Sequence, residues 1–214
     1  MRSVQAFAGA GVLAFTAALA SACSHARWVT VPPRVGLESY RRIGLVEFGS
    51  NSQGKLAAFT SQQFIEGLQA AQPGVAILEL GPSERVLKQV GRSELDIDAL
   101  KAVGEQFKVD AVFTGRLDVT DVKPRVSLAT IASALSAGAE VSSSLTARLQ
   151  ETGGAATVWT GSSQGRETVA YVTFLPGKGA RFDAKDPENA YGSLVAGMIG
   201  RITYDFQPTQ RRVR

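Results

Sequence analysis

Short apolar segments alternate with one-sided helical stretches in the first half of this chain, and that alternation constrains the fold more than any other feature. Ile43 to Phe48 and Val75 to Leu80 are apolar runs of strand length, bounded by turn residues. From Lys55 to Ala71, apolar residues recur at spacings of seven, four and three, which places them on one face of a helix. A strand, a helix and a second strand in this order predict a parallel β-α-β unit with a right-handed crossover.

The same pattern continues along the chain. A short helix is expected from Gly81 to about Val90, because Pro and Ser near its start favour a helical N-terminus. Asp96 is placed to cap a further helix, whose apolar side chains would face the core. Val109 to Leu117 then has the apolar centre of an inner strand.

The second half of the chain predicts antiparallel strands. Residues 118–144 show no clear period, and Lys123-Pro124-Arg125 would interrupt a strand ladder. Either a hairpin that turns near Ala137-Gly138 or an added helix fits this segment, and the hairpin is favoured. Leu145 to Gln150 alternates as a half-exposed strand does. A Gly-Gly turn leads from it into Thr157 to Thr160, which predicts an antiparallel hairpin.

A long helix is the clearest element near the C-terminus. Asp186-Pro187-Glu188 is a helix start, and residues 191–202 carry an apolar stripe that must be buried. Before this helix, residues 169–182 read as a surface excursion around Pro176-Gly177. The predicted fold class is therefore α/β (α+β): a mixed β-sheet with a parallel β-α-β start, an antiparallel C-terminal hairpin and packed helices, including a long C-terminal helix.

The N-terminus has the features of an export signal. Arg2 is the only charge before the apolar run Ala6 to Ala20, which is too short to span a membrane and is typical of a secretory signal peptide. Cys23, the only cysteine, follows Ala20-Ser21-Ala22, which an ordinary signal peptidase would also accept. The segment resembles a bacterial lipobox, except that Ala20 stands where such boxes favour Leu.

Cys23 is the candidate lipidation site. A lone cysteine makes no internal disulfide, and an exposed thiol is a liability in an oxidising compartment, so a free thiol or an intermolecular disulfide is the weaker interpretation. Acylation with fatty acids such as palmitate would hold the chain stably on a bilayer, because each additional acyl chain adds membrane affinity. Ser24, rather than Asp, after the cysteine resembles the outer-membrane sorting pattern. We therefore expect a lipid-anchored protein on the periplasmic face of the outer membrane.

This interpretation divides the chain into four parts. Residues 1–22 are the signal peptide, residues 23–40 are a lipidated tether interrupted by Pro and Gly, and residues 41–207 are a single domain. Residues 208–214 are a basic tail. An unstructured solubilising end is favoured for this tail over a contact with anionic lipid headgroups or with an acidic partner.

Charge and composition argue against several functions. The formal net charge is +4, and removal of Arg2 with the leader lowers it to +3. No basic stripe is interleaved with aromatic residues, which argues against nucleic-acid binding. His25 is the only histidine and has no partner near it for a metal site or a catalytic dyad. We therefore expect no cofactor, no metal and no small-molecule substrate.

A possible phosphate-binding loop is the most specific motif. Gly49-Ser50-Asn51-Ser52-Gln53-Gly54-Lys55 matches G-x-x-x-x-G-K between a strand and a helix, a context in which backbone N–H groups and a lysine hold phosphate oxygens. However, Leu56 replaces the magnesium-binding Ser or Thr, and no apolar strand ends in the Asp that would complete the metal site. An exported protein also lacks a supply of nucleoside triphosphate. A glycine-rich turn is favoured, and nucleotide binding is the weaker alternative.

Two further patterns match part of a catalytic site but lack its other elements. Ser52-x-x-Lys55 matches the serine-lysine nucleophile of penicillin-recognising enzymes, but the Ser-Asp-Asn element is missing and Lys178-Gly179 is not Lys-Thr-Gly. Glu47 and Glu79 lie in predicted strands and could pair for acid-base work, although salt-bridged or solvent-facing carboxylates are the simpler explanation. We therefore expect no catalytic residues and no enzyme activity.

Several of these segments together resemble a known superfamily. The first strand and the helix up to Ala71, the second strand, the run Phe107 to Gly115 and the motif Gly153-Gly154-x-x-x-Val158-Trp159 are similar to those of the curli-secretion-channel (CsgG-like) superfamily. This superfamily includes lipoproteins that resemble the outer-membrane activator of penicillin-binding proteins, and its fold is similar to the amino-terminal domain of TolB. Its members include channels, synthase activators and ring-forming export lipoproteins.

These expectations lead to one functional hypothesis and one rival. The favoured hypothesis is an outer-membrane-anchored periplasmic lipoprotein that acts as a non-enzymatic interaction or assembly module and contacts an envelope protein or copies of itself. The rival is a subunit of an oligomeric CsgG-like secretion ring in which residues 121–145 insert in the membrane. Membrane hairpins need lipid-facing apolar positions and aromatic girdles, and residues 126–149 contain no aromatic residue.

Overall fold

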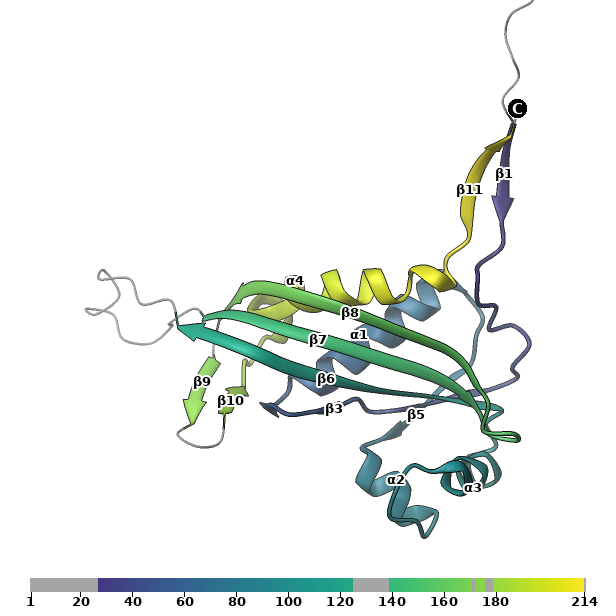
Figure 1. Ribbon diagram of the computed structural model, residues 1–214, viewed down its shortest axis with the longest axis horizontal. Helices are drawn as coiled ribbons and strands as arrows, with labels where there is room; N and C mark the ends of the chain where they lie inside the picture. The colour runs from purple at the N-terminus through teal and green to yellow at the C-terminus, as the bar shows by residue number, and fades with distance from the viewer. Residues whose placement is uncertain (1–26, 125–138, 171, 176–178, 214) are drawn as a thin grey trace, which may run out of the picture. The chain divides into compact units, whose positions relative to one another are not determined.

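The computed structural model describes residues 27–124, 139–170, 172–175 and 179–213 (Figure 1). Cys23, the expected leader and the turn expected near Ala137-Gly138 lie outside these residues. The chain divides into two compact units, one made of its two ends and the other of residues 32–207. We call the second unit the body.

The described part of the first unit is a two-stranded ribbon. β1 (Arg27–Val31) pairs antiparallel with β11 (Thr209–Val213). The sequence predicts an irregular tether and an unstructured tail at these positions. That prediction is wrong for these residues, because the two ends of the chain pair with each other.

A mixed sheet forms the centre of the body. β2 lies between two parallel neighbours, β5 and β6, which confirms the predicted β-α-β unit. β6, β7 and β8 continue the sheet as long antiparallel strands, and the strand order is β5-β2-β6-β7-β8. These strands are β2 (Ile43–Val46), β5 (Ile77–Gly81), β6 (Ala111–Pro124), β7 (Ala139–Glu151) and β8 (Thr157–Val169).

Helices cover both faces of this sheet, with α1 and α4 on one face and α2 and α3 on the other (Figure 1). Two of them begin where the sequence predicts: Asp96, the predicted cap, accepts a hydrogen bond from the main-chain N–H of Ala99 at 2.7 Å, and Asp186, at the predicted helix start, accepts one from Asn189 N–H at 3.2 Å. Among the described residues, no helix is long and apolar enough to cross a membrane. The helices are α1 (Leu56–Ala71), α2 (Ser83–Gln89), α3 (Ile97–Phe107) and α4 (Pro187–Ile202), and a 3-10 turn, η2 (Tyr204–Phe206), follows α4.

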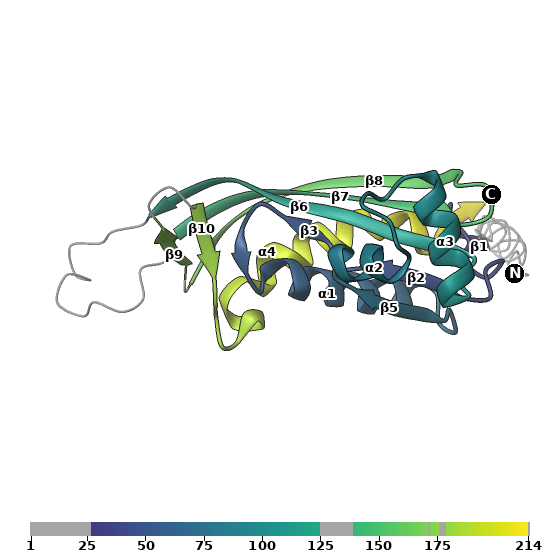
Figure 2. The same cartoon turned by 90° about the horizontal axis from the view of Figure 1, so that it is seen from below.

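Short strands occupy places where the sequence predicts loops. β3 (Gly49–Ser50) pairs with β6, and β4 (Gln53–Gly54) pairs in parallel with β10 (Gly179–Phe182). β10 also pairs antiparallel with β9 (Val172–Leu175). The predicted surface excursion is therefore part of a small three-stranded sheet, which lies at one end of the long strands β6 to β8 (Figure 2).

β6 is longer than the sequence predicts. It continues through Lys123, which pairs with Glu140, to Pro124, which pairs with Ala139. The expected interruption of the ladder is wrong because Pro124 is the last residue of the strand, a position at which its missing N–H costs little. The described residues of the 118–144 segment are therefore strands, as the hairpin interpretation expects.

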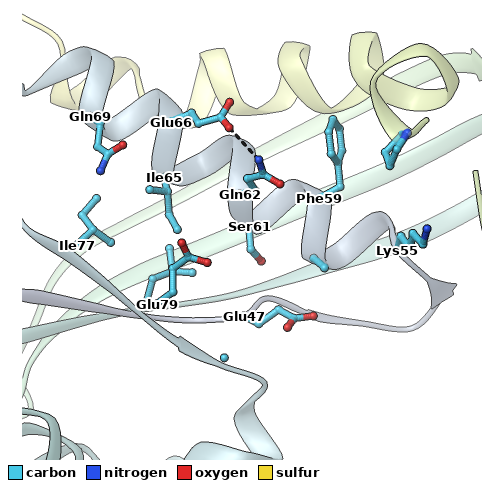
Figure 3. A pocket seen from close by; sticks show the side chains of 14 residues that line it. Glu47, Lys55, Phe59, Ser61, Gln62, Ile65, Glu66, Gln69, Ile77 and Glu79 are labelled. Atoms are coloured by element: carbon cyan, nitrogen blue, oxygen red, sulfur yellow. Dashed lines mark hydrogen bonds between the residues drawn. The ribbon is translucent and has the colours of Figure 1, made fainter. Parts of the chain in front are cut away.

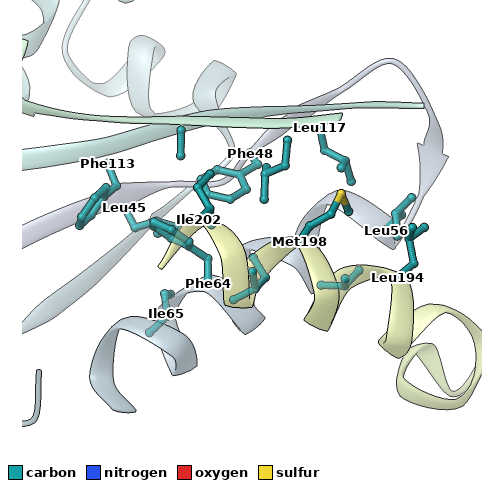
Figure 4. Close-up of a cluster of buried hydrophobic side chains, with 14 of the residues drawn as sticks. Leu45, Phe48, Leu56, Phe64, Ile65, Phe113, Leu117, Leu194, Met198 and Ile202 are labelled. Atoms are coloured by element: carbon teal, nitrogen blue, oxygen red, sulfur yellow. The ribbon is translucent and has the colours of Figure 1, made fainter. Parts of the chain in front are cut away.

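The main core lies between the sheet and the helix pair α1 and α4 (Figure 4). Phe113 of β6 is central to it, because its ring centroid lies 5.2 Å from that of Phe64 in α1, 6.2 Å from that of Trp159 and 5.9 Å from that of Phe206. The apolar stripe predicted for α4 is buried against this cluster. Burial of each large side chain contributes about 1.5 to 3 kcal/mol, so this face fixes how α1 lies on the sheet.

Candidate functional site

A groove runs between α1 and the sheet edge formed by β2 and β5 (Figure 3). It exists because β5 is an edge strand while α1 packs inward against the core, which leaves the outer side of the helix and the adjacent face of β5 open. The groove has a volume of about 610 Å³, which lies within the range of known ligand pockets. We call it the acidic groove, after its charged and amide side chains: Glu47, Lys55, Gln62, Glu66, Gln69 and Glu79.

Strand pairing brings Glu47 and Glu79 into this groove together. Glu79 in β5 pairs with Leu45 in β2. Glu47 lies two residues beyond Leu45 and therefore on the same side of the extended chain, and its main-chain N–H donates a hydrogen bond to Gly81 O at 2.9 Å. The two carboxylates that the sequence singles out thus line one site.

α1 supplies the opposite wall. Gln62, Glu66 and Gln69 are spaced by four and three residues, so they share one helix face (Figure 3). Glu66 accepts hydrogen bonds from the side-chain amides of Gln62, at 3.1 Å, and of Gln63, at 2.8 Å. This wall is not among the residues predicted from the sequence, although a polar stripe at helical spacing beside the apolar one is a signal for it.

The groove carries an unbalanced negative charge. Its three carboxylates face a single ammonium, that of Lys55, which leaves a formal charge of −2 in a chain whose net charge is +4. The side chains of Glu47, Glu79 and Lys55 have no hydrogen-bond or ion-pair partner among the described residues. This excess of negative charge suits the groove to a positively charged group.

The floor of the groove is apolar. Lysine and arginine side chains bury their methylene stems on such a surface and keep the charged end at a polar rim. An apolar floor beside unpaired carboxylates therefore matches one basic side chain better than a small inorganic cation. The floor and its margins are formed by Leu45, Phe59, Ile65, Ile77 and Pro187.

The hydroxyl of Ser61, which also lines the groove, makes hydrogen bonds with the main chain. Its Oγ accepts a hydrogen bond from the main-chain N–H of Phe48 at 2.9 Å and donates one to Ala57 O at 3.0 Å. A serine nucleophile needs its proton directed at a base, whereas this proton is directed at a carbonyl. Ser61 therefore joins the end of β2 to α1.

The Gly49–Lys55 loop is held by pairing with other strands. β3 pairs with β6, β4 pairs with β10, and the main-chain N–H of Lys55 donates to Phe182 O at 2.7 Å. The side-chain amide of Asn51 exchanges two hydrogen bonds, of 2.8 and 3.0 Å, with the main chain of Val119. A phosphate-binding loop needs several free N–H groups that face one point. Here the loop connects β6 to β10, and this geometry opposes the nucleotide-binding alternative.

Gly54 is required by this connection rather than by a phosphate. Its φ of +93° is unfavourable for other residues, and a Cβ at this position would overlap the carbonyl oxygen of Phe182. The hydroxyl of Ser52 lies 2.9 Å from that of Ser50. In the part of the chain that the structure describes, no hydrogen bond joins Ser52 to Lys55, so the serine-lysine pattern does not form a dyad.

Two other predicted features bear on function. Within the described ranges, no group of three or more His, Cys, Asp or Glu side chains is arranged to hold a metal ion. Cys23 lies outside these ranges, so its acylation stays a prediction.

The described residues of the 121–145 segment belong to the body. Val122 pairs with Val141, and Val141 is fully buried in the main core. The opposite side of the same strands carries Lys123 and Glu140. These residues therefore give the membrane-insertion hypothesis no apolar face for lipid.

Comparison with known proteins gives similarities of structure. No family model matches the sequence, and no curated protein sequence matches it. The chain is similar to a PelC dodecamer from Paraburkholderia phytofirmans, with 12% sequence identity and a TM-score of 0.45 over 85% of this chain and 97% of that chain. It is also similar to lipoprotein GNA1162 from Neisseria meningitidis, with 21% identity and a TM-score of 0.34 over 59% and 83% of the two chains.

A third similar structure is the LpoB C-terminal domain from Escherichia coli, with 10% identity and a TM-score of 0.35 over 58% of this chain and 81% of that chain. These identities and TM-scores are too low to carry an argument about function. Lipoproteins are thus among the solved structures that this chain is similar to, and membership of the CsgG-like superfamily stays a prediction.

Proposed function

We propose that this protein is an outer-membrane-anchored periplasmic lipoprotein that acts as a non-enzymatic interaction module and holds a basic segment of an envelope protein at the acidic groove. The observation that carries the proposal is the pair Glu47 and Glu79, two carboxylates in one groove without a partner among the described residues. Each of these carboxylates adds a formal negative charge to the groove. A cationic side chain bound there would be attracted by both of them, so the charge of the groove favours a basic partner.

Recognition at the groove combines charge with apolar contact. The stem of an arginine or lysine would lie on Ile65 and Ile77, and its charged end would reach the carboxylates of Glu47 and Glu79. An arginine should bind more tightly than a lysine, because its guanidinium donates two parallel hydrogen bonds to a carboxylate. The negative field of the groove would also speed association with a basic partner.

The free edge of β5 suits an extended partner segment. β5 pairs with β2 on one side, and no described strand pairs with it on the other. A segment that adds to this edge would form main-chain hydrogen bonds along residues 77–81 and would send alternate side chains over the groove. The partner segment is therefore expected to be extended, with basic residues at alternate positions.

The contacts within the groove support binding rather than catalysis. Ser61 directs its proton at a main-chain carbonyl, and two neutral amides bind Glu66. The envelope location rests on the leader and on Cys23, which follows it at the place of a lipidated cysteine.

Photo-crosslinking in intact cells tests the groove. A photoreactive amino acid replaces Gln69, which lines the groove, or Gln106, which is exposed on α3 and serves as the matched control. We expect a discrete adduct from position 69 that disappears when Glu47→Gln and Glu79→Gln are added. No adduct at position 69, the same adduct at position 106, or an adduct that survives the two glutamine substitutions would contradict the proposal.

The anchor is tested separately. Labelled palmitate should enter the wild-type protein and not Cys23→Ser, and Cys23→Ser should leave the membrane fraction in a high-salt wash. A wild-type protein that takes up no label would refute the lipid anchor and leave the crosslinking test of the groove unaffected. Light scattering in detergent tests the rival ring hypothesis. A monomer or dimer would refute the ring, and a large symmetric oligomer would refute the simple interaction module.

A further inference from the structure

The ribbon of β1 and β11 exposes apolar and cationic side chains together. Trp28 is 63% exposed, and three valines of the ribbon are 37 to 43% exposed. Neither strand contains an Asp or a Glu. The exposed apolar and cationic side chains are Trp28, Val29, Val31, Val213, Arg27, Arg211 and Arg212.

Strand pairing distributes these side chains over both faces of the ribbon. Directly paired residues share a face. Trp28 pairs with Arg212 on one face, and Val29 pairs with Arg211 on the other. Each face thus places an arginine beside an apolar side chain.

A ribbon of two five-residue strands is marginal in water by itself. All five residues of β1 are exposed, so nothing in the described chain buries them. A surface that covers the apolar side chains and also accepts hydrogen bonds from the arginines would stabilise the ribbon.

The position of the ribbon in the sequence indicates which surface this is. Arg27 follows Cys23 by four residues, and four residues span at most about 14 Å. With Cys23 acylated, as the proposed function requires, β1 begins close to the bilayer surface. We propose that the ribbon inserts among the anionic headgroups of the bilayer, so that Trp28 lies at the membrane interface and Arg212 and Arg211, one on each face of the ribbon, bind lipid phosphates.

The chemistry of these side chains fits that surface. Tryptophan is enriched at membrane interfaces, because its indole combines an apolar ring with a hydrogen-bond donor. The planar guanidinium of arginine matches the geometry of phosphate oxygens. Each arginine near an anionic leaflet raises the membrane affinity about fivefold. The ribbon would therefore be a second attachment beside the acyl chains, and it would hold the C-terminal strand at the membrane as well.

Vesicle binding by a protein without acyl chains tests this inference independently of the anchor. Cys23→Ser, exported with its own leader and purified, is mixed with vesicles that contain phosphatidylglycerol or with vesicles of phosphatidylcholine alone. We expect co-sedimentation with the anionic vesicles and a blue shift of tryptophan emission. Trp28→Phe should abolish the blue shift, because the remaining Trp159 is only 6% exposed. Arg211→Gln with Arg212→Gln should weaken binding at least tenfold, and high salt should do the same.

Two controls separate this result from general charge effects and from the groove. Arg85→Gln with Arg148→Gln removes the same charge from exposed positions in the body and should leave binding within twofold. Glu47→Gln with Glu79→Gln should also leave vesicle binding unchanged, so failure of the groove proposal and failure of the ribbon proposal are distinguishable. Equal binding to both kinds of vesicle, equal losses in the two arginine pairs, no binding, or a dimer that Trp28→Phe dissociates would each overturn the proposal.

Discussion

The side-chain amide of Gln72 connects the main chain of Leu37 to that of Phe206. Its Oε1 accepts a hydrogen bond from Leu37 N at 2.7 Å, and its Nε2 donates to Phe206 O at 3.0 Å and to Val35 O at 2.6 Å. Gln72 follows the last residue of α1. One side chain thus holds together the segment before β2, the end of α1 and the segment after α4.

Gln72→Leu should therefore destabilise the body strongly. The substitution leaves one main-chain N–H and two carbonyls without their partner, and each buried polar group left in this way costs about 1 to 3 kcal/mol. We expect the free energy of unfolding, measured by urea denaturation, to fall by about 3 kcal/mol. Gln89→Leu, at the exposed end of α2, is the matched control and should change it by less than about 0.5 kcal/mol. Equal losses in the two variants would refute the role of Gln72.

Gly54→Ala tests the loop that resembles a phosphate-binding motif. The alanine must adopt a φ of +93° and its Cβ would overlap Phe182 O, so both backbone strain and a lost strand pairing are expected. Gly74→Ala is the control, because Gly74 has a φ of +95° with nothing within 4 Å of an added Cβ. We expect about 1 kcal/mol of destabilisation at position 74, from strain alone, and at least about 2 kcal/mol at position 54. Equal effects on thermal unfolding would mean that the contact with β10 contributes nothing.

Tyr191 has a buried hydroxyl without a hydrogen-bond partner among the described residues. Its ring lies edge-on to Phe59 and Phe182, at centroid distances of 5.5 and 6.1 Å, and a phenylalanine would keep both contacts. Because an unsatisfied buried hydroxyl is costly, Tyr191→Phe should raise the free energy of unfolding at neutral pH by about 1 kcal/mol. A destabilised variant would show that the hydroxyl has a favourable partner.

Tyr191 should also make the free energy of unfolding depend on pH. Burial, and then the charge of Asp183, raises the pKa of Tyr191 from 10.0 to about 12. A raised pKa means that the folded state holds the proton more tightly than the unfolded state. The associated stability is complete below pH 10 and is lost as the pH rises from 10 to about 12. Urea titrations across this window should show a steeper loss in the wild type than in Tyr191→Phe, and parallel curves would contradict the assignment.

Local sequence signals predict most elements of the body because each depends on the spacing of neighbouring residues. The apolar stripe of α4 and the caps at Asp96 and Asp186 are of this kind. The ribbon is different, because β1 and β11 come from opposite ends of the chain and neither has an alternating apolar pattern of its own. Pairing of such strands depends on contacts between residues that are far apart in the sequence, which no local window contains.

Part of the candidate site could also be predicted from such local signals. Glu47 and Glu79 follow from the strand predictions, because a β-α-β unit places its two strands in one sheet. The wall formed by Gln62 and Glu66 depends on how α1 is rotated about its axis. That rotation is set by the packing of Phe64 against Phe113, a contact between segments that are far apart in sequence.

Removal of the two groove carboxylates should separate binding from stability. Glu47→Gln with Glu79→Gln breaks no ion pair within the described chain, so the free energy of unfolding should stay within about 0.5 kcal/mol of the wild type. Binding of a fluorescent peptide with alternating arginine and valine should weaken at least tenfold in fluorescence anisotropy, because each desolvated charge pair lost costs about 2 kcal/mol or more. Glu84→Gln with Glu94→Gln makes the same change in charge at exposed positions outside the groove and should weaken binding less than twofold. If both pairs weaken the peptide equally, its attraction comes from the overall charge of the protein, and the acidic groove is not its site.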